Sequence, residues 1–135
     1  MTQGERLADA ALALVGVPFR LHGRDPATGL DCVGLVVAAM QATGRRPDVP
    51  AGYSMANLSV SAWLPMAAAS GWMETSGEPM AGDLLFAVPG PARAHLLLAT
   101  GTGAFVHAHA GLRRVVHTPP PLPWPIRRQW RLADL

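Results

Sequence analysis

Apolar residues recur at helical spacing near the start of the chain. Thr2 is followed three residues later by Glu5, which is the spacing of a capping box at a helix N-terminus. The pattern predicts a first helix that begins behind Thr2 and ends near Gly16 and Pro18. The apolar positions of this helix are Leu7, Ala10, Ala11, Leu14 and Val15.

Two more helices are predicted in the first half of the chain. Asp31 is a favourable N-cap, and residues 32–43 behind it are apolar enough for a buried helix that Gly44 closes. Residues 59–70 also carry apolar positions at helical spacing, but Pro65 allows only a short or kinked helix there.

From Gly82 onward the chain has the pattern of a sheet. Five short apolar runs rich in β-forming residues are separated by glycine and proline turns. Because helices come first and strands afterwards, the pattern favours an α+β layout with a mostly antiparallel five-stranded sheet over a βαβ repeat. The five runs are residues 83–88, 95–100, 104–108, 112–118 and 127–132.

The remaining segments are predicted to be connections. Residues 18–30 contain glycines and prolines and predict a loop, and residues 45–53 predict an exposed connection for the same reason. Residues 119–125 are rich in proline. Between two strands this composition favours a stiff connection over a motif for a polyproline-binding partner.

Length and composition are those of one domain over residues 1–135. The chain is 50% hydrophobic and 15% charged, which argues against intrinsic disorder and provides enough apolar surface for a core. Cys32 is the only cysteine, so the sequence excludes an internal disulfide and a zinc site built from several thiolates. All eleven basic residues are arginines scattered in ones and twos, a pattern that does not favour nucleic-acid binding.

The sequence shows no targeting or membrane-spanning pattern. Its first residues lack the positive start and the uninterrupted apolar core of a signal peptide. No segment reaches the roughly 18 consecutive apolar residues that a membrane helix needs. We therefore expect a protein that is made in the cytoplasm, is not inserted in a membrane and leaves the cell only with another carrier.

Cys32 occupies the first turn of the second predicted helix. Unpaired backbone N–H groups and the positive end of the helix dipole lower the pKa of a thiol at such a place from its usual value of about 8.5. The same N–H groups can hold an oxyanion. A lone buried cysteine is nevertheless more often a small core residue, so Cys32 by itself does not predict catalysis.

Two histidines change this interpretation. His95 opens one predicted strand and His107 lies in the next, so a hairpin would bring both imidazoles toward one end of the sheet. Together with Cys32 they supply a nucleophile, a base and an orienting group. His109 competes with His107, because the two-residue period of a strand places both on one face. A metal site with these three histidines and Cys32 as ligands is the alternative.

Several motifs resemble the NlpC family of papain-like cell-wall cysteine peptidases. They are Leu30-Asp31-Cys32-Val33-Gly34-Leu35, Gly82-Asp83-Leu84-Leu85-Phe86, and His95 followed twelve positions later by His107. The segment Gly16-Val17-Pro18-Phe19-Arg20 falls where the family has a glycine, a proline and a tyrosine before the catalytic loop. The resemblance covers nearly the whole chain and implies a papain-like fold, with N-terminal helices packed on the sheet.

The resemblance also implies roles for the three candidate residues. Cys32 is the nucleophile that attacks a peptide carbonyl, His95 the base that takes its proton, and His107 the polar group that holds the imidazole of His95. This chemistry needs no metal or other cofactor. The family's usual substrate is the stem peptide of peptidoglycan, cut between D-glutamate and the diamino acid. The residues expected to contact the substrate are Asp31, Phe19, His22 and Trp124.

Two positions depart from the family pattern. Phe19 stands where the family commonly has a tyrosine whose hydroxyl reaches the active site, so that hydrogen bond cannot come from this position. His22, three residues on, is a candidate substitute. Val33 stands where many members have serine, and we expect its side chain to pack inside.

The length and the C-terminal segment point to a narrower resemblance. The ending from Val115 through Trp124 to Trp130-Arg131-Leu132 is similar to versions encoded among the tail genes of phages and phage-like gene transfer agents. This implies synthesis in the bacterial cytoplasm and a place in a tail particle, with tail structural proteins as partners. The alternatives are a structural tail component that has lost catalysis and a toxin delivered by a secretion system.

Overall fold

Three helices and a short 3-10 helix precede most of the strands. The computed structural model describes residues 1–90 and 93–133. Its helical elements are α1 (Gln3–Ala13), α2 (Cys32–Ala42), η1 (Met55–Asn57) and α3 (Val60–Ala69). Its strands are β1 (Arg24–Asp25), β2 (Gly29–Leu30), β3 (Trp72–Glu74), β4 (Leu84–Gly90), β5 (Arg93–Ala99), β6 (Phe105–His109), β7 (Arg114–Thr118) and β8 (Ile126–Leu132).

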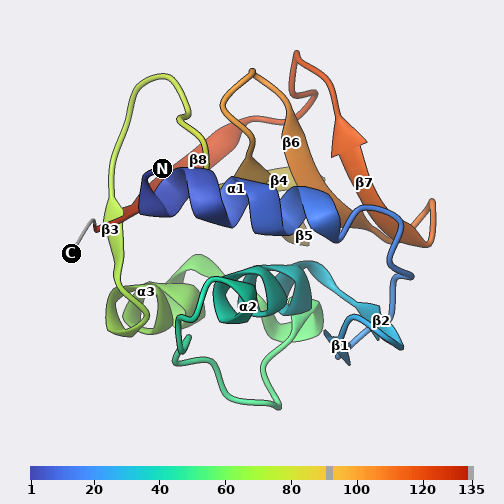
Figure 1. Ribbon diagram of the computed structural model, residues 1–135. Helices are drawn as coiled ribbons and strands as arrows, with labels where there is room; N and C mark the ends of the chain where they lie inside the picture. Colours follow the sequence, from blue (N-terminus) through green and yellow to red (C-terminus); the bar gives the residue numbers. More distant parts are fainter. Residues whose placement is uncertain (91–92, 134–135) are drawn as a thin grey trace.

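The main sheet has six strands in the order β3-β8-β4-β5-β6-β7, and all neighbouring strands are antiparallel. The helices lie together on one side of this sheet, with α1 running across it and α2 beside α1 (Figure 1). This arrangement confirms the predicted α+β class and the mostly antiparallel sheet.

The sequence signals at the helix ends act as predicted. The hydroxyl of Thr2 accepts from the backbone N–H of Glu5, and the carboxylate of Glu5 accepts from the N–H of Thr2, each at 3.0 Å, which completes the capping box. Asp31 caps α2, and α3 runs through Pro65 for 10 residues. The N-caps Thr2 and Asp31 therefore define where α1 and α2 begin.

Three expectations about the connections and the sheet were wrong. The predicted five-stranded sheet has a sixth strand, β3, whose three residues pair with β8 and are too few to give a sequence pattern. Residues 18–30, expected to be a loop, contain the small antiparallel pair β1 and β2. The segment 45–53 ends in Tyr53, which is only 7% exposed because its ring packs into the core.

Both faces of the central strands are covered. Alternate residues of β4 and β5 belong to two core clusters, so neither strand shows the alternation of a half-exposed sheet. The larger cluster joins the sheet to the helices. The smaller one lies on the other face, where Leu122 and Trp124 of the proline-rich segment pack on it. Its buried members are Leu85, Ala87, Leu97, Ala99 and Phe105.

Asp83 joins strands at the start of β4. Its fully buried carboxylate accepts from Arg131 at 2.8 and 2.9 Å, from Gln129 at 3.0 Å and from the backbone N–H of Met80 at 2.9 Å. A buried carboxylate with these partners is satisfied. Asp83 therefore has a structural role.

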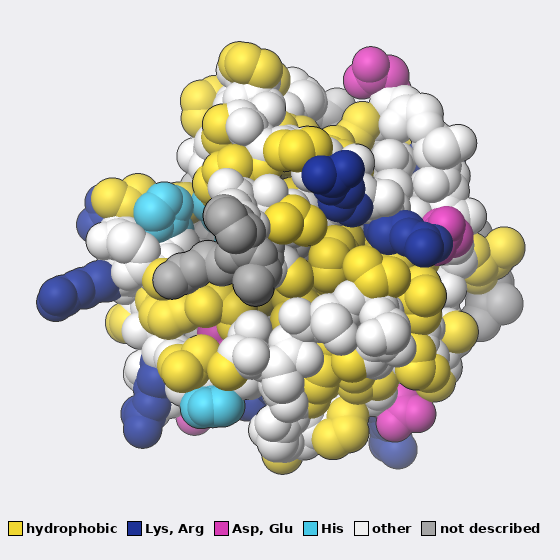
Figure 2. All heavy atoms as spheres, turned by 180° about the vertical axis from the view of Figure 1, so that it is seen from behind, with side chains coloured by type: hydrophobic (Ala, Val, Ile, Leu, Met, Phe, Trp, Pro, Cys, Tyr) yellow, Lys and Arg dark blue, Asp and Glu magenta, His cyan; other side chains and the backbone are white. Residues whose placement is uncertain are grey.

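The surface carries few charges. Apolar side chains spread over much of the face opposite to the one in Figure 1, and arginines do not gather into one patch there (Figure 2). Within the described part of the chain, no helix is long and apolar enough to cross a membrane.

Candidate active site

Asp31 holds the N-terminus of α2 in place. Its carboxylate accepts from the backbone N–H of Gly34 at 2.8 Å and from those of His22 and Met55 at 3.1 Å each. One buried side chain thus fastens the first turn of α2 to two loops that are far away in the sequence. Because these N–H groups occupy its carboxylate and it does not line the cleft described below, Asp31 is a positioning residue and not the expected substrate contact.

Gly34 allows the loop before α2 to approach the helix closely. A Cβ at this position would collide with the carbonyl oxygen of Gly23. The glycine of the Asp31-Cys32-Val33-Gly34 motif is therefore required by packing. Val33 is fully buried, as expected.

Cys32 is the first residue of α2, and it is 0% exposed. Burial raises the pKa of its thiol to about 12, and the charge of Asp31 acts in the same direction, whereas the backbone groups of Leu96, Val33 and Cys32 act to lower it. The prediction of a lowered thiol pKa at the helix N-terminus was wrong, because desolvation of the thiolate exceeds the stabilisation by these N–H groups. At neutral pH the resting group is a thiol.

His95 and His107 make contact at the end of β5 and β6 where these two strands separate. β5 and β6 pair only at Leu98–Val106 and Ala99–Phe105, so the strands separate toward the start of β5. There Nε2 of His95 lies 2.9 Å from Nδ1 of His107. The helix α2 contacts both strands, and Cys32 at its N-terminus lies next to the backbone of Leu96, the residue that follows His95.

Thr118 extends the chain of hydrogen bonds. Its Oγ1, at the end of β7, lies 2.8 Å from Nε2 of His107. Both nitrogens of the His107 ring are therefore used, one on His95 and one on Thr118. The sequence offered no signal for Thr118, because its approach depends on the register of β6 with β7.

Burial keeps both imidazoles uncharged at neutral pH. Desolvation, with the charges of His107 and His109, lowers the pKa of His95 to about 3. Desolvation, with the charge of His109, lowers the pKa of His107 to about 4. The resting site is thus a neutral thiol near two neutral imidazoles.

Trp124 packs beside the two histidines on the face of the sheet that carries the smaller core cluster. Its ring stands perpendicular to those of His95 and His107, at centroid distances of 5.7 and 5.6 Å. The proline-rich segment that carries Trp124 therefore completes the wall of the site.

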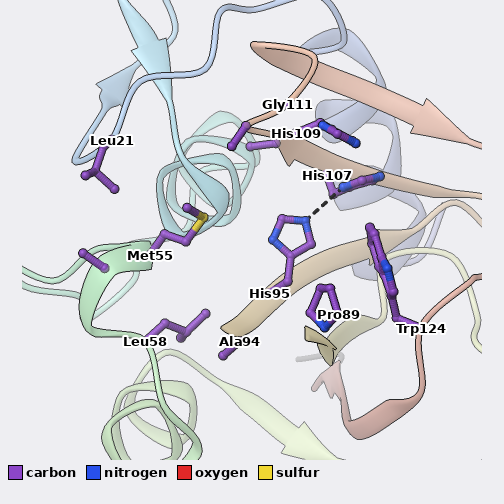
Figure 3. Close-up of a pocket in the computed structure, with 13 residues that line it drawn as sticks. Leu21, Met55, Leu58, Pro89, Ala94, His95, His107, His109, Gly111 and Trp124 are labelled. Atoms are coloured by element: carbon purple, nitrogen blue, oxygen red, sulfur yellow. Dashed lines mark hydrogen bonds between the residues drawn. The ribbon is translucent and has the colours of Figure 1, made fainter. Parts of the chain in front are cut away.

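These residues line a cleft of about 460 Å³. His95 and Trp124 stand on one side of it, with Met55 and Leu58 across from them (Figure 3). Cys32 is fully buried and does not line the cleft. Among the described residues that line it, the histidines are the only titratable side chains, so the cleft is mostly apolar.

The other predicted site residues lie outside the cleft or at its edge. Phe19 is half-buried and packs against the larger core cluster, and the side chain of His22 is exposed. Neither lines the cleft, whereas Leu21 between them does. His109 lines the cleft too, but its Nδ1 accepts from the N–H of Leu112 at 3.0 Å, so its partners differ from those of His107.

The geometry does not favour the metal-site alternative. No group of three or more histidine, cysteine or acidic side chains within residues 1–90 and 93–133 is arranged to hold a metal ion. The facing nitrogens of His95 and His107 bond to each other, which leaves no shared position for an ion between them.

The family model for the NlpC/P60 family matches residues 16–121, which is most of the chain and includes Cys32, His95 and His107. The chain belongs to the NlpC/P60 family. This confirms the family predicted from the motifs around Cys32, His95 and His107. Among curated proteins, none matches the chain.

Solved structures agree with this NlpC/P60 domain in fold. NlpC1 and NlpC2 from Trichomonas vaginalis superpose with TM-scores of 0.70 and 0.69 at 20% identity over 96% of this chain. The chain spans only 45% and 48% of those two proteins. The NlpC/p60 domain of the peptidoglycan hydrolase SagA superposes with a TM-score of 0.60 at 26% identity, over 87% of this chain and 89% of that one. These neighbours confirm the papain-like fold.

Proposed function

We propose that this protein is a cysteine peptidase that hydrolyses amide bonds in the stem peptides of peptidoglycan, with Cys32, His95 and His107 as its working set. The observation that carries the proposal is the bonded pair of His95 and His107, together with Cys32 at the start of α2 beside the backbone of Leu96, the residue after His95. Membership in the NlpC/P60 family and the likeness to a domain of a peptidoglycan hydrolase support the substrate class.

The hydrogen bonds indicate how protons are arranged before the reaction. A base for Cys32 needs an unprotonated nitrogen, and Nε2 of His95 is already bonded to His107. We assign the proton of His95 to Nε2, which donates to Nδ1 of His107 and leaves Nδ1 of His95 free to accept. His107 then carries its own proton on Nε2 and donates it to Oγ1 of Thr118.

Attack and proton transfer are coupled because the thiol is neutral at rest. The sulfur of Cys32 bonds to the carbonyl carbon while its proton moves to Nδ1 of His95, and the carbonyl π electrons move to oxygen. Collapse of this intermediate expels the amine, which takes the proton from His95 and leaves a thioester. Water, deprotonated by His95, then releases the acid and restores the thiol.

The finer assignments rest on the sequence resemblance. We propose that the bond cut is the one between D-glutamate and the diamino acid. We also propose that the protein is made in the bacterial cytoplasm and acts from a phage-like tail particle, with tail structural proteins as partners. Detection of the chain in purified particles tests that placement, and its absence from them contradicts it.

The test of activity uses defined muropeptides. Wild-type protein and its Cys32→Ala variant are incubated separately under reducing conditions across pH 5 to 8, and the fragments are identified by mass. We expect a new free amine on the diamino acid with the wild type only. A wild type that yields no fragments would favour a structural component instead.

A further inference from the structure

Tyr53 is the only tyrosine of the chain, and its buried hydroxyl donates no hydrogen bond to any described residue. The side chain is 7% exposed, and its ring stacks on that of Trp63 with centroids 6.4 Å apart and planes 17° from parallel. Within the described part of the chain, the hydroxyl has no partner in hydrogen-bond geometry. A buried polar group left unpaired costs folding free energy, so its presence calls for an explanation.

The backbone holds Tyr53 against the start of α2. Arg24 donates to the carbonyl oxygen of Tyr53 through Nη2, and its Nη1 lies 3.6 Å from the carboxylate of Asp31. The N–H of Met55 donates to the same carboxylate at 3.1 Å. Residues 53–55 are thus tied at two points to the residue that directly precedes Cys32.

The hydroxyl of Tyr53 and the thiol of Cys32 interact electrostatically. Burial raises the pKa of Tyr53, and the charge of an ionised Cys32 raises it further, while the backbone of Ser59 lowers it. Tyr53 therefore keeps its proton at neutral pH. The hydroxyl belongs to the same buried cluster as Cys32 and donates its proton to no described group at rest. A neutral O–H in this position can donate to a charge that exists only during the reaction.

We propose that the hydroxyl of Tyr53 donates a hydrogen bond to the oxyanion that forms when Cys32 attacks a carbonyl. The inference rests on the proposed function, because it requires Cys32 to be the nucleophile. Tyr53 keeps its proton throughout, and only its hydrogen bond to the developing charge forms. The position of Phe19 can supply no such donor, because the phenylalanine ring lacks a hydroxyl.

The Tyr53→Phe variant tests the proposal, because it keeps the ring that stacks on Trp63 and removes only the hydroxyl. Two thiol reagents are compared on the same protein. Acylation by p-nitrophenyl acetate passes through an oxyanion, whereas alkylation by iodoacetamide does not. The chain has no lysine amine to compete, so intact mass with a Cys32→Ala blank reports the thioester at Cys32.

We expect Tyr53→Phe to slow acylation of Cys32 by at least about tenfold and to leave alkylation within about twofold of the wild type. The free energy of unfolding should be unchanged or slightly raised, because an unpaired buried hydroxyl is removed. Acylation that is unchanged, or that falls by the same factor as alkylation, overturns the proposal. A wild type that forms no thioester at Cys32 overturns it as well.

The muropeptide assay and the acylation assay can fail independently of each other. If Cys32 is acylated and the variant slows that step, but no muropeptide is cut, the proposed substrate is wrong and the role of Tyr53 stands. Trp72→Phe is the matched control. Like Tyr53→Phe, this variant removes a buried donor, the indole N–H, that has no hydrogen-bond partner among the described residues. Trp72 lies on β3, and the strands β8 and β4 separate β3 from β5, which carries His95. This variant should acylate like the wild type.

Discussion

His107 faces His95 with one ring nitrogen, at 2.9 Å, and Thr118 with the other, at 2.8 Å. The tautomer of His107 therefore decides whether Nδ1 of His95, the nitrogen that His107 does not bond, carries a proton or can accept one. If Thr118 accepts from His107, the free nitrogen of His95 is an acceptor for the Cys32 proton. The hydroxyl of Thr118, which contacts neither nucleophile nor base, thereby acts as a positioning group for the base.

Removing the hydroxyl of Thr118 should disturb this tautomer. Thr118→Val keeps the shape of the side chain, and we expect kcat to fall about tenfold with KM little changed, since one neutral hydrogen bond is lost. Thr118→Ser, which keeps the hydroxyl, should retain most of the activity. Nitrogen chemical shifts of the histidine rings report the tautomer directly. Identical ring shifts in Thr118→Val and the wild type would refute this role.

His107 and His109 lie on the same strand, but only His107 is bonded to His95. We expect His107→Ala to lower kcat/KM by about a hundredfold or more, because His95 loses the partner that orients it. His109→Ala should cost little, since its Nδ1 accepts only from the backbone of Leu112. Activity assays of both variants decide the matter. A larger loss in His109→Ala would show that the roles are reversed.

The fold should lose stability on mild acidification. The pKa values of His95 and His107 are about 3 and 4 in the folded chain, below the usual 6.5, so the unfolded chain binds protons first. As pH falls from 7 to 5, each group can lower the free energy of unfolding by up to about 1.4 kcal/mol per pH unit below 6.5. Urea unfolding at both pH values measures this. His107→Asn should show a smaller loss, and an equal loss would contradict the assignment.

Met55 connects the cleft with the core around the thiol. Its side chain lines the cleft and also packs against the core cluster that contains Cys32. We expect Met55→Ala to open a path to the sulfur and to raise the rate of alkylation by iodoacetamide severalfold. Leu58→Ala, on the same wall of the cleft, is the comparison. An unchanged rate in Met55→Ala would mean that substrate reaches the thiol from another side.

Local signals explain what could be predicted from the sequence. The Asp31 cap defines the start of α2 and therefore the place of Cys32. The glycine turn between two apolar runs puts His95 and His107 on neighbouring strands, and they make contact where these strands separate. These features depend on residues close together in the chain, which a pattern can report.

The features that the sequence did not reveal depend on contacts between segments that are far apart in the chain. The thiol pKa follows the burial of Cys32 by the whole core, which the helix N-terminus alone does not reveal. Thr118 reaches His107 only through the register of β6 with β7. Arg24 links the backbone of Tyr53 to Asp31, so a segment that the sequence predicts to be an exposed connection is held against the residue before Cys32.

We expect Cys32 to form a covalent acyl intermediate with a stem peptide. Acid quenching of the wild type during turnover, followed by intact mass and peptide mapping, measures this directly. We predict an adduct on Cys32 whose mass is that of the N-terminal fragment minus water, and which hydroxylamine removes. Fragments that also form with Cys32→Ala, or turnover without any adduct on Cys32 in repeated quenches, would contradict the account.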